Sequence, residues 1–499
     1  MAIARGSAML LVGEILANAA AVAPSAVAAT LDDRSMAFGE IDAAANQVAR
    51  SLAGMGVGRG DRVLWWGETD LDAVPVFGAL ARLGGVFAPL NARASLGEIG
   101  PVGEYAKPRI VLAGASHADA GAELARDLGV PFATDVLARA AGESDAELPP
   151  TGVEERDPHV IFFTSGSTGK PKGVVLSHRT NWLRTFVGAT TSAGGGGVVC
   201  MFPLFHMAGW TIALGAWQAR RAIHFVRVPD AAALLSTTAR HRAARLYCIP
   251  AVWGRVLEHG VDAYDLSSLT EADTGTSATP MELLRAIKDA LPRTATRVFY
   301  GSTEAGPSLA LADGDLFRKP GSVGVAQPGV EVRLDARGEV CVRSPFLMDG
   351  YFDNPDATAE AVVDGWYHTG DLGAFDDDGY MAIVGRARDV IRTGGETVAP
   401  PEVEAVLGAH PAIAEIAVVG VPDPEWGEIV TAVIVPRPGA GPPTVDDLRA
   451  FCDGRLAGFK QPRRVALVDA LPRTAATAQI QRTLIVEQLQ QRPVANDSI

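Results

Sequence analysis

One short stretch, residues 163–173, concentrates the side chains and glycines that bind anions. Its glycines allow backbone N–H groups to approach a phosphate, its hydroxyls add hydrogen-bond donors, and its lysines supply positive charge. The spacing differs from that of the common G-x-x-x-x-G-K-[ST] loop, and an isolated stretch of this kind is more often a polar surface turn. We predict a phosphate loop presented by a strand over residues 160–163. Its candidate ligands are Thr164, Ser165, Gly166, Ser167, Thr168, Gly169, Lys170 and Lys172.

Further motifs follow in a fixed order. Residues 300–306 combine an aromatic ring, hydroxyls and a carboxylate, and residues 366–372 place Asp371 where a strand ends. A carboxylate at that point can accept hydrogen bonds from both hydroxyls of a ribose. Residues 385–389 and 394–404 complete the series. Together these motifs favour a nucleotide site over unrelated surface turns.

Segments with helical periodicity alternate with short β-branched runs between residues 37 and 335, which predicts parallel sheets with crossover helices. Short strands and turn signals follow residue 338, and an α+β pattern follows residue 386. We therefore predict an α/β fold with a large multi-layer N-terminal domain over 1–386, which includes a small β-rich subdomain. A small mobile α+β domain is expected over 387–499, with a hinge near Arg388.

Composition narrows the function further. The 499 residues carry a net charge of −14, which disfavours nucleic acid and anionic membrane surfaces as partners. The four cysteines lack the spacing of a disulfide framework or a zinc site, which suits a reducing cytoplasmic location. Glu14 interrupts the apolar run 8–29, so we predict an amphipathic helix and a strand there, with no membrane span. The oligomeric state, including a homodimer, stays open.

These motifs, over about residues 10–488, resemble those of acyl-CoA synthetases in the adenylate-forming superfamily, which also contains luciferases and peptide-synthetase adenylation domains. The resemblance implies a reaction in two steps. A carboxylic acid attacks ATP to give an acyl-adenylate, and the thiol of CoA then displaces AMP after the C-terminal domain rotates. Mg²⁺ would accompany ATP.

The resemblance also assigns roles to residues. Thr303 would contact the AMP phosphate, and Glu304 with Thr168 would hold Mg²⁺. Tyr300, with Gly301 and Ser302 beside it, would stack on adenine, and Asp371 with Arg386 would bind the ribose. Residues 275–277 would border the adenine, and Gly394, Gly395 and Glu396 would form a tunnel for CoA. The assigned adenine-border and acyl-pocket residues are Gly275, Thr276, Ser277, Phe205, His206, Gly209, Trp210, Val252 and Ala305.

Each assignment has a structural alternative. Tyr300 and His206 could be core residues, Glu304 an exposed carboxylate, Asp371 a turn residue and the Gly394–Gly395 pair an ordinary turn. Because the acyl-pocket candidates are apolar or small, they favour a bulky apolar acid over a charged dicarboxylate.

One expected residue is absent. The family uses a C-terminal lysine for adenylation, but no lysine follows Lys460, and Ala478 and Gln479 occupy the aligned positions. Losing such a charge costs about 3 kcal/mol at a transition state. Natural divergence explains the local sequence better than one engineered substitution, although Arg473 or Arg482 could replace the cation.

Three hypotheses follow, with Gln479, Thr303, Glu304 and His206 as candidate catalytic residues. The first is a ligase specialised for converting acyl-AMP and CoA to acyl-CoA and AMP, with a separate adenylating enzyme as a possible supplier of acyl-AMP. The second is a complete ATP-dependent acyl-CoA synthetase with a displaced cation. The third is a non-catalytic protein that binds nucleotides or acyl-adenylates.

Overall fold

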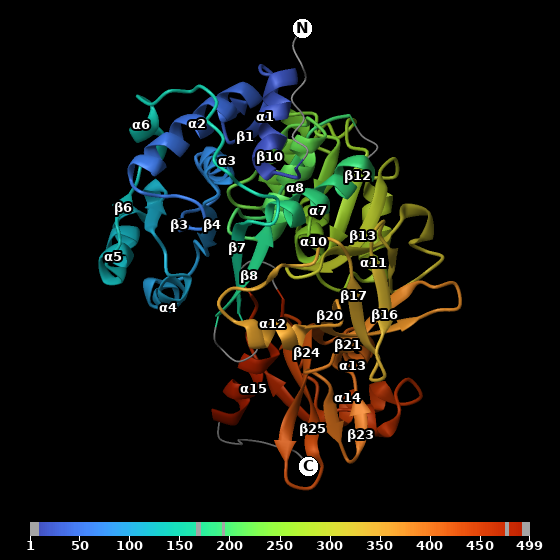
Figure 1. Ribbon diagram of the computed structural model, residues 1–499. Coiled ribbons are helices and arrows are strands. Elements are labelled where there is room, and N and C mark those ends of the chain that lie inside the picture. Colours follow the sequence, from blue (N-terminus) through green and yellow to red (C-terminus); the bar gives the residue numbers. More distant parts are fainter. Residues whose placement is uncertain (1–8, 166–170, 192–194, 475–478, 492–499) are drawn as a thin grey trace. The chain divides into compact units, whose positions relative to one another are not determined.

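The computed structural model describes residues 9–165, 171–191, 195–474 and 479–491. It divides into two compact units (Figure 1). Unit 1 comprises Met1–Pro320, Gly324–Glu331 and Val342–Tyr367, and unit 2 comprises Gly321–Val323, Val332–Cys341 and His368–Ile499. The boundary predicted at residue 386, with its hinge at Arg388, stays a prediction.

The first sheet of unit 1 has the strand order β18-β8-β7-β4-β3-β5-β6. Neighbouring strands from β7 through β4, β3 and β5 to β6 are parallel, whereas β8 forms an antiparallel hairpin with β7. Apolar side chains fill both faces of the central strands, as expected for parallel strands covered by helices. The strands are β3 (Arg62–Trp66), β4 (Val86–Leu90), β5 (Ile110–Ala113), β6 (Phe132–Ala133), β7 (Pro158–Ser165), β8 (Pro171–Ser177) and β18 (Gly350–Tyr351).

The second sheet of unit 1 runs in the order β15-β14-β13-β12-β11-β9-β10-β1-β2. Its strands from β13 to β1 are parallel, and β14, β15 and β2 are antiparallel to their neighbours. These strands are β1 (Val27–Leu31), β2 (Arg34–Ala37), β9 (Val198–Cys200), β10 (Ile223–Phe225), β11 (Arg245–Tyr247), β12 (Glu271–Gly275), β13 (Ala295–Ser302), β14 (Gly306–Leu311) and β15 (Ser322–Ala326). The α/β class predicted from the alternating pattern is confirmed.

The helices of unit 1 follow from amphipathic periodicity. In α2 (Phe38–Gly54) the buried residues Ile41, Ala45, Val48 and Leu52 recur every three or four positions, so one face meets the core. The Glu40 carboxylate caps the first turn by accepting the Ala37 N–H at 2.7 Å. The other helices are α1 (Val12–Val22), α3 (Ala73–Leu83), α4 (Leu96–Ala106), α5 (Ala118–Leu128), α6 (Val136–Ala140), α7 (His178–Thr191), α8 (Met207–Gln218), α9 (Ala231–Arg240), α10 (Pro250–His259), α11 (Met281–Ala290) and α12 (Pro355–Ala361).

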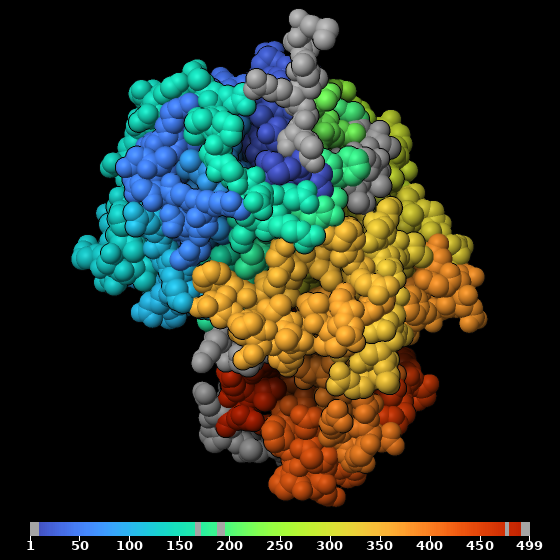
Figure 2. Space-filling model, viewed as in Figure 1, coloured from blue at the N-terminus to red at the C-terminus, as the bar shows by residue number. Residues whose placement is uncertain are grey.

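The connection after α6 lies against α2, as the teal and blue surfaces of Figure 2 show. Asn46 donates to the Asp145 carbonyl at 2.9 Å, and Arg50 donates to the Ala146 carbonyl at 2.8 Å. These bonds satisfy backbone groups of an otherwise irregular segment. Among the described residues, no helix has both the length and the apolar character needed to cross a bilayer.

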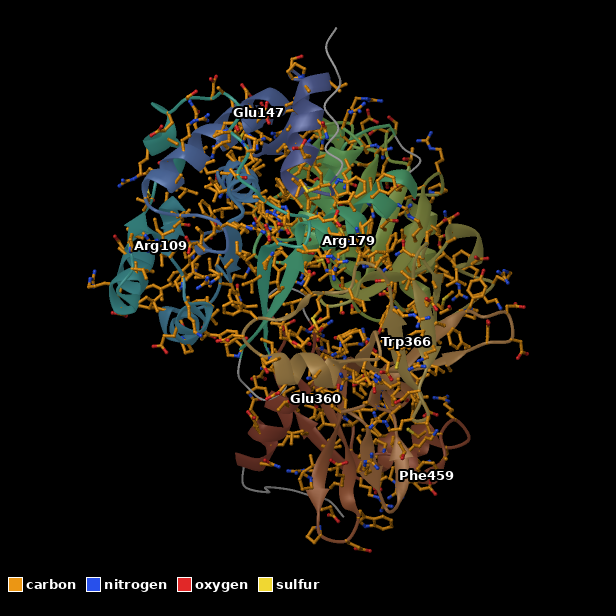
Figure 3. All side chains as sticks on the ribbon, viewed as in Figure 1. Arg109, Glu147, Arg179, Glu360, Trp366 and Phe459 are labelled. Carbon is orange, nitrogen blue, oxygen red and sulfur yellow. The ribbon has the colours of Figure 1, made fainter. Side chains whose placement is uncertain are left out.

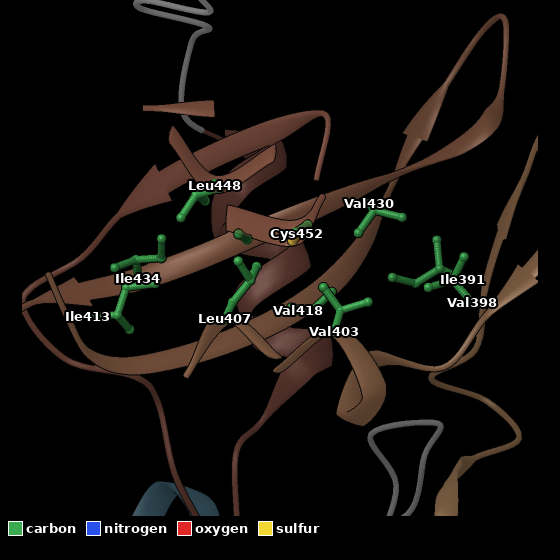
Figure 4. Packing of buried hydrophobic residues seen from close by; sticks show 11 residues of the cluster. Ile391, Val398, Val403, Leu407, Ile413, Val418, Val430, Ile434, Leu448 and Cys452 are labelled. Carbon is green, nitrogen blue, oxygen red and sulfur yellow. The ribbon is translucent and has the colours of Figure 1, made fainter. Parts of the chain in front are cut away.

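Unit 2 is built around the long antiparallel pair β24 (Ile413–Asp423) and β25 (Gly427–Pro436). Apolar side chains from this pair and from α13 (Pro400–Leu407) and α14 (Val445–Cys452) form a buried cluster (Figure 4). The predicted α+β pattern after residue 386 is found in this unit, where β24 has 11 residues, β25 has 10 residues and α14 ends at Cys452.

Its remaining elements are shorter. They are β16 (Glu331–Leu334), β17 (Glu339–Arg343), β19 (Val362–Val363), β20 (Trp366–Phe375), β21 (Met381–Arg386), β22 (Ile391–Thr393), β23 (Glu396–Val398), β26 (Arg464–Leu467) and α15 (Arg482–Gln491). Of these, β19, the first residue of β16, the last two of β17 and the first two of β20 belong to unit 1, whereas the first two residues of β15 belong to unit 2.

Candidate functional site

The predicted phosphate loop connects β7 and β8. The two strands pair with Thr164 opposite Lys172 and Ser165 opposite Pro171, so the strand expected before the loop is confirmed. Gly166, Ser167, Thr168, Gly169 and Lys170 lie outside the described residues. Gly173 belongs to β8, where an added Cβ would come within 2.9 Å of Ile161. Packing between strands therefore explains this glycine.

Lys172 is linked through the Tyr351 side chain to Glu304, the carboxylate predicted to hold Mg²⁺. The Lys172 ammonium lies 4.8 Å from the centre of the Tyr351 ring. The Tyr351 hydroxyl donates to Glu304 Oε1 at 3.1 Å. Burial and the nearby Glu304 carboxylate raise the pKa of Tyr351, so its hydroxyl stays protonated and remains a donor.

A buried arginine holds the backbone that carries Glu304. Arg184 of α7 is 1% exposed, and its guanidinium donates to the carbonyls of Thr303, Glu304 and Phe346, each at 2.8 Å. Burial lowers the pKa of Arg184 to about 10, which still leaves it charged at pH 7. This residue was missed by the sequence reasoning because its partners lie more than one hundred positions along the chain. We infer that it positions the Thr303–Glu304 turn.

The proposed adenine-binding segments lie at the same edge of the second sheet. Residues 275–277 follow β12, and Tyr300, Gly301 and Ser302 end its parallel neighbour β13. Ligands of open α/β sheets bind outside the carboxyl ends of strands. Thr276 has a φ of 68°, a backbone conformation that residues other than glycine adopt rarely. Tyr300 is half-buried and Ser277 is exposed.

Four acyl-pocket candidates, Phe205, His206, Gly209 and Trp210, lie at the start of α8, whereas Val252 belongs to α10 and Ala305 precedes β14. His206 caps this helix, with Nδ1 accepting the Ala208 N–H at 3.2 Å. Loss of solvent around the ring lowers the pKa of His206 to about 4, so the imidazole is neutral at pH 7. Phe205 and His206 are partly exposed, whereas Gly209, Val252 and Ala305 are buried.

Trp210 has a different environment. It is 2% exposed and stacks on Phe77 with ring centres 3.9 Å apart, while its indole N–H donates to the Leu204 carbonyl at 2.6 Å. These contacts favour a packing role for Trp210. Trp366, labelled in Figure 3, is also a packing residue, with the Arg343 guanidinium 4.5 Å from its ring centre.

A polar cavity of about 400 Å³ in unit 1 involves none of the predicted site residues. It is lined by Arg156, Arg179, Thr180, Ser344, Pro345, Leu347, Met348 and Asp349.

In unit 2, the predicted ribose ligands are adjacent. Asp371 of β20 lies opposite Arg386 of β21, and Arg386 Nε is 2.8 Å from Asp371 Oδ1. The ion pair orients the carboxylate of Asp371, a residue that is 7% exposed. Arg388, the predicted hinge, follows this strand, and its Nε lies 3.5 Å from Asp389 Oδ1.

Gly394 and Gly395 form the two-residue turn between β22 and β23. Their φ values are 58° and 84°, as a type I′ hairpin turn requires. A Cβ on Gly394 would come within 2.8 Å of the Trp426 ring, whereas Gly395 has open space around it. The hairpin geometry explains both glycines locally, and Glu396 beside them is exposed. Their place in a CoA tunnel stays a prediction.

Gln479, one of the two positions that the sequence aligns with the family lysine, makes two hydrogen bonds with Thr474. The Thr474 N–H donates to the Gln479 carbonyl at 2.8 Å, and the Gln479 N–H donates to the Thr474 hydroxyl at 3.0 Å. Ala478 lies outside the described residues. Nearby cations already bind carboxylates, because Arg473 lies 2.6 Å from Glu415 and Arg482 lies 2.5 Å from Glu404.

A scan of protein families matches residues 16–352 to the AMP-binding enzyme model and residues 402–477 to the AMP-binding enzyme C-terminal domain. The chain belongs to the AMP-binding enzyme family. It is an acid–thiol ligase of the AMP-forming acyl-CoA synthetase type, which uses ATP and CoA and proceeds through an acyl-adenylate.

Among its relatives, a feruloyl-CoA synthase from Amycolatopsis is 33% identical over 92% of this chain and 95% of its own. The long-chain-fatty-acid–CoA ligase FadD13 of Mycobacterium tuberculosis is 30% identical over 96% of this chain and 98% of its own. The crystal structure of ATP-bound MatB from Rhodopseudomonas palustris superimposes with a TM-score of 0.88 at 29% identity, covering 96% of this chain and 99% of that one. These relatives favour the complete ATP-dependent ligase over an enzyme restricted to thioester formation.

Proposed function

We propose that this ligase activates a bulky apolar carboxylic acid with MgATP and completes both half-reactions, forming the adenylate without a C-terminal lysine. The observation that carries this proposal is the contact chain from Lys172 through Tyr351 to Glu304. An enzyme supplied with ready-made acyl-AMP has no triphosphate to bind. The Lys172 ammonium and the Glu304 carboxylate, joined through Tyr351, therefore support the use of ATP.

Mg²⁺ is the metal that this arrangement suits. Glu304 offers a partly exposed carboxylate, and Mg²⁺ is bound through one or two carboxylates together with phosphate oxygens. Thr168, in the loop outside the described residues, would add a hydroxyl. The ion would neutralise charge on the leaving pyrophosphate. Arg184 would keep Glu304 in place for that contact.

The cation for adenylation is proposed to come from the phosphate loop. Arg473 and Arg482 are engaged with Glu415 and Glu404, so using either would require breaking an ion pair. Lys170 and Lys172 are the candidates that we favour, because both belong to the predicted phosphate loop. Because a neutral Gln479 amide replaces a point charge, we expect adenylation to be slower than in a variant with lysine at this position.

The acid is proposed to be aromatic or long-chain aliphatic. Phe205, Gly209, Val252 and Ala305 offer only apolar or small surfaces, and His206 is neutral. A second carboxylate would lose its hydration without gaining a cation in such a pocket. The activities named for the feruloyl-CoA and fatty-acyl-CoA relatives agree with this class.

Two half-reactions measured separately test this proposal. ATP–pyrophosphate exchange is measured with a hydroxycinnamic acid, a long-chain fatty acid and a short dicarboxylic acid, and thioester formation is measured from CoA and each synthetic acyl-AMP. We expect exchange with at least one apolar acid and none with the dicarboxylate. Thioester formation from acyl-AMP without any exchange would instead support the restricted enzyme, and tight AMP binding without either reaction would support a binding protein.

A further inference from the structure

A second group of metal-ligating side chains lies within unit 2, apart from every residue discussed for the ligase reaction. Asp335 follows β16, Glu339 begins β17, and His368 belongs to β20. One ligand atom from each residue lies within 4.8 Å of the other two. The Cys341 thiol is next to them, 3.5 Å from His368 Nδ1.

The spacing of these atoms suits a single metal ion. Ligand atoms at 2.0–2.2 Å from a tetrahedral Zn²⁺ are about 3.3–3.6 Å apart. The separation between His368 Nδ1 and Glu339 Oε2 is 3.3 Å. Modest side-chain rotation brings the Asp335 carboxylate, already within 4.8 Å, to the third position.

Backbone donors orient both carboxylates and leave one oxygen of each toward the cluster. Glu339 Oε1 accepts the Gly370 N–H at 2.8 Å, so Oε2 faces His368. Asp335 Oδ1 accepts the N–H groups of Arg337 and Glu339 at 2.8 and 2.9 Å. Hydrogen bonds of this kind fix ligands around a metal and tune its affinity. The Glu339 side chain is 10% exposed and that of His368 is 22% exposed, which shields the cluster but leaves a path from solvent.

An exposed arginine now neutralises the two carboxylates. Arg337 Nε lies 3.3 Å from Asp335 Oδ2, and Arg337 Nη2 lies 3.4 Å from Glu339 Oε2. Its side chain is 78% exposed, so the guanidinium is held weakly and can move into solvent. Arg337 therefore competes with a divalent cation for the same two oxygens.

We propose that Asp335, Glu339 and His368 form a binding site for Zn²⁺ or a similar divalent transition metal, with water completing the coordination. Two carboxylates balance the charge of the ion, and the imidazole selects against Mg²⁺ and Ca²⁺. Sequence reasoning missed these residues, because they come from two segments about thirty residues apart and lack a ligand motif.

The bound metal would join the β16–β17 turn to β20. His368 precedes the predicted ribose ligand Asp371 by three residues on that strand. The proposed site is therefore structural: it would fix the strand that presents Asp371, and its metal would take no part in the reaction.

Metal binding to the tag-free full chain tests this proposal. After treatment with a chelator, the chain is titrated with Zn²⁺ by calorimetry and with Co²⁺ by visible spectroscopy. We expect one equivalent of each to bind, with a Co²⁺ d–d spectrum that reports nitrogen and oxygen ligands. Mg²⁺ at the same concentration should neither bind nor compete. Zn²⁺ should raise the melting temperature of the chain.

Variants locate the binding. His368→Ala and Glu339→Gln should each weaken Zn²⁺ binding by about tenfold or more. Arg337→Gln removes the competing cation and should tighten binding by about two- to fivefold. His241→Ala is the matched control, because His241 stacks on His224 in unit 1 with ring centres 4.3 Å apart and must not contribute.

The outcomes separate a metal site from a hydrogen-bonded turn. Zn²⁺ binding that His368→Ala leaves unchanged, or that His241→Ala abolishes, overturns the proposal. So does an absence of Zn²⁺ binding, or equal competition by Mg²⁺. If His368→Ala fails to fold, the exposed Arg337→Gln variant decides the question, and an unchanged Kd there overturns the proposal.

Discussion

Replacing Arg184 tests whether a buried cation positions the Thr303–Glu304 turn. In Arg184→Met, a flexible apolar side chain of similar length keeps much of the packing but donates no hydrogen bonds. Three carbonyls lose their guanidinium donor. The Glu304 carbonyl keeps the Met348 N–H at 2.7 Å, so the Thr303 and Phe346 carbonyls are the groups most affected.

Two opposing terms set the magnitude. Hydrogen bonds from a charged donor contribute about 1.5–3 kcal/mol each, or roughly 4–9 kcal/mol for three. Burial opposes this, because lowering the pKa of Arg184 from 12.5 to about 10 corresponds to about 3 kcal/mol against the charged form. The hydrogen bonds therefore dominate. We expect Arg184→Met to reduce the free energy of unfolding by about 1–5 kcal/mol.

The functional effect should fall on MgATP. A loosened turn displaces Glu304, so the KM for MgATP in ATP–pyrophosphate exchange should rise and kcat should fall, while the KM for CoA in thioester formation from acyl-AMP changes little. Arg179→Met is the matched control, because Arg179 is the second residue of the same helix (Figure 3). Its partly exposed ion pair with Glu155 has a separation of 3.0 Å. Removing this pair should lower the free energy of unfolding by less than about 1 kcal/mol. Unchanged stability and unchanged MgATP kinetics in Arg184→Met would refute the positioning role.

Three further predictions concern charge. Glu304→Gln should lower ATP–pyrophosphate exchange by about tenfold or more and spare thioester formation from acyl-AMP, because only the first step needs the metal; equal losses in both assays would count against this role. Gln479→Lys should accelerate exchange, by up to about a hundredfold if the ammonium reaches the adenylation site, and an unchanged rate would show that the loop lysines suffice. Burial lowers the pKa values of His178, His206 and His224 to about 4. Between pH 6.5 and 4 these histidines are therefore protonated in the unfolded chain but stay neutral in the folded chain. Stability should therefore fall as pH falls through that window, by about 1.4 kcal/mol per pH unit for each histidine, and urea unfolding of His224→Gln should show a shallower dependence on pH than the wild type.

The sequence predicted those features that depend on neighbours along the chain. The predicted alternation of helices and strands is an example, since α3 carries local signals in its apolar residues and in the glycine after its last turn. The strand before the predicted phosphate loop was likewise visible from its apolar run over residues 160–163. Arg184 and Tyr351 were missed, since each reaches Glu304 only after the sheets have assembled. Trp210 was assigned to the acyl pocket from its apolar ring, and its stacking on Phe77 adds a packing role that the sequence alone could not distinguish from a pocket role. Its place in the acyl pocket stays a prediction.

The predicted loss of the family lysine and the environment of Glu304 carry unequal weight in choosing between the two ligase hypotheses. A lysine at residue 478 or 479 would act on the first half-reaction alone, and its loss would lower a rate without removing a binding site. Arg184, by contrast, uses a buried charge to hold the backbone of both Thr303 and Glu304. A chain supplied with acyl-AMP would still need Thr303 for the AMP phosphate, so this arginine serves either hypothesis. The hydrogen bond from Tyr351 to Glu304 separates them, because the carboxylate predicted to hold Mg²⁺ serves only the step that uses ATP. That contact is the physical reason to favour a complete ligase over one that has lost its first step.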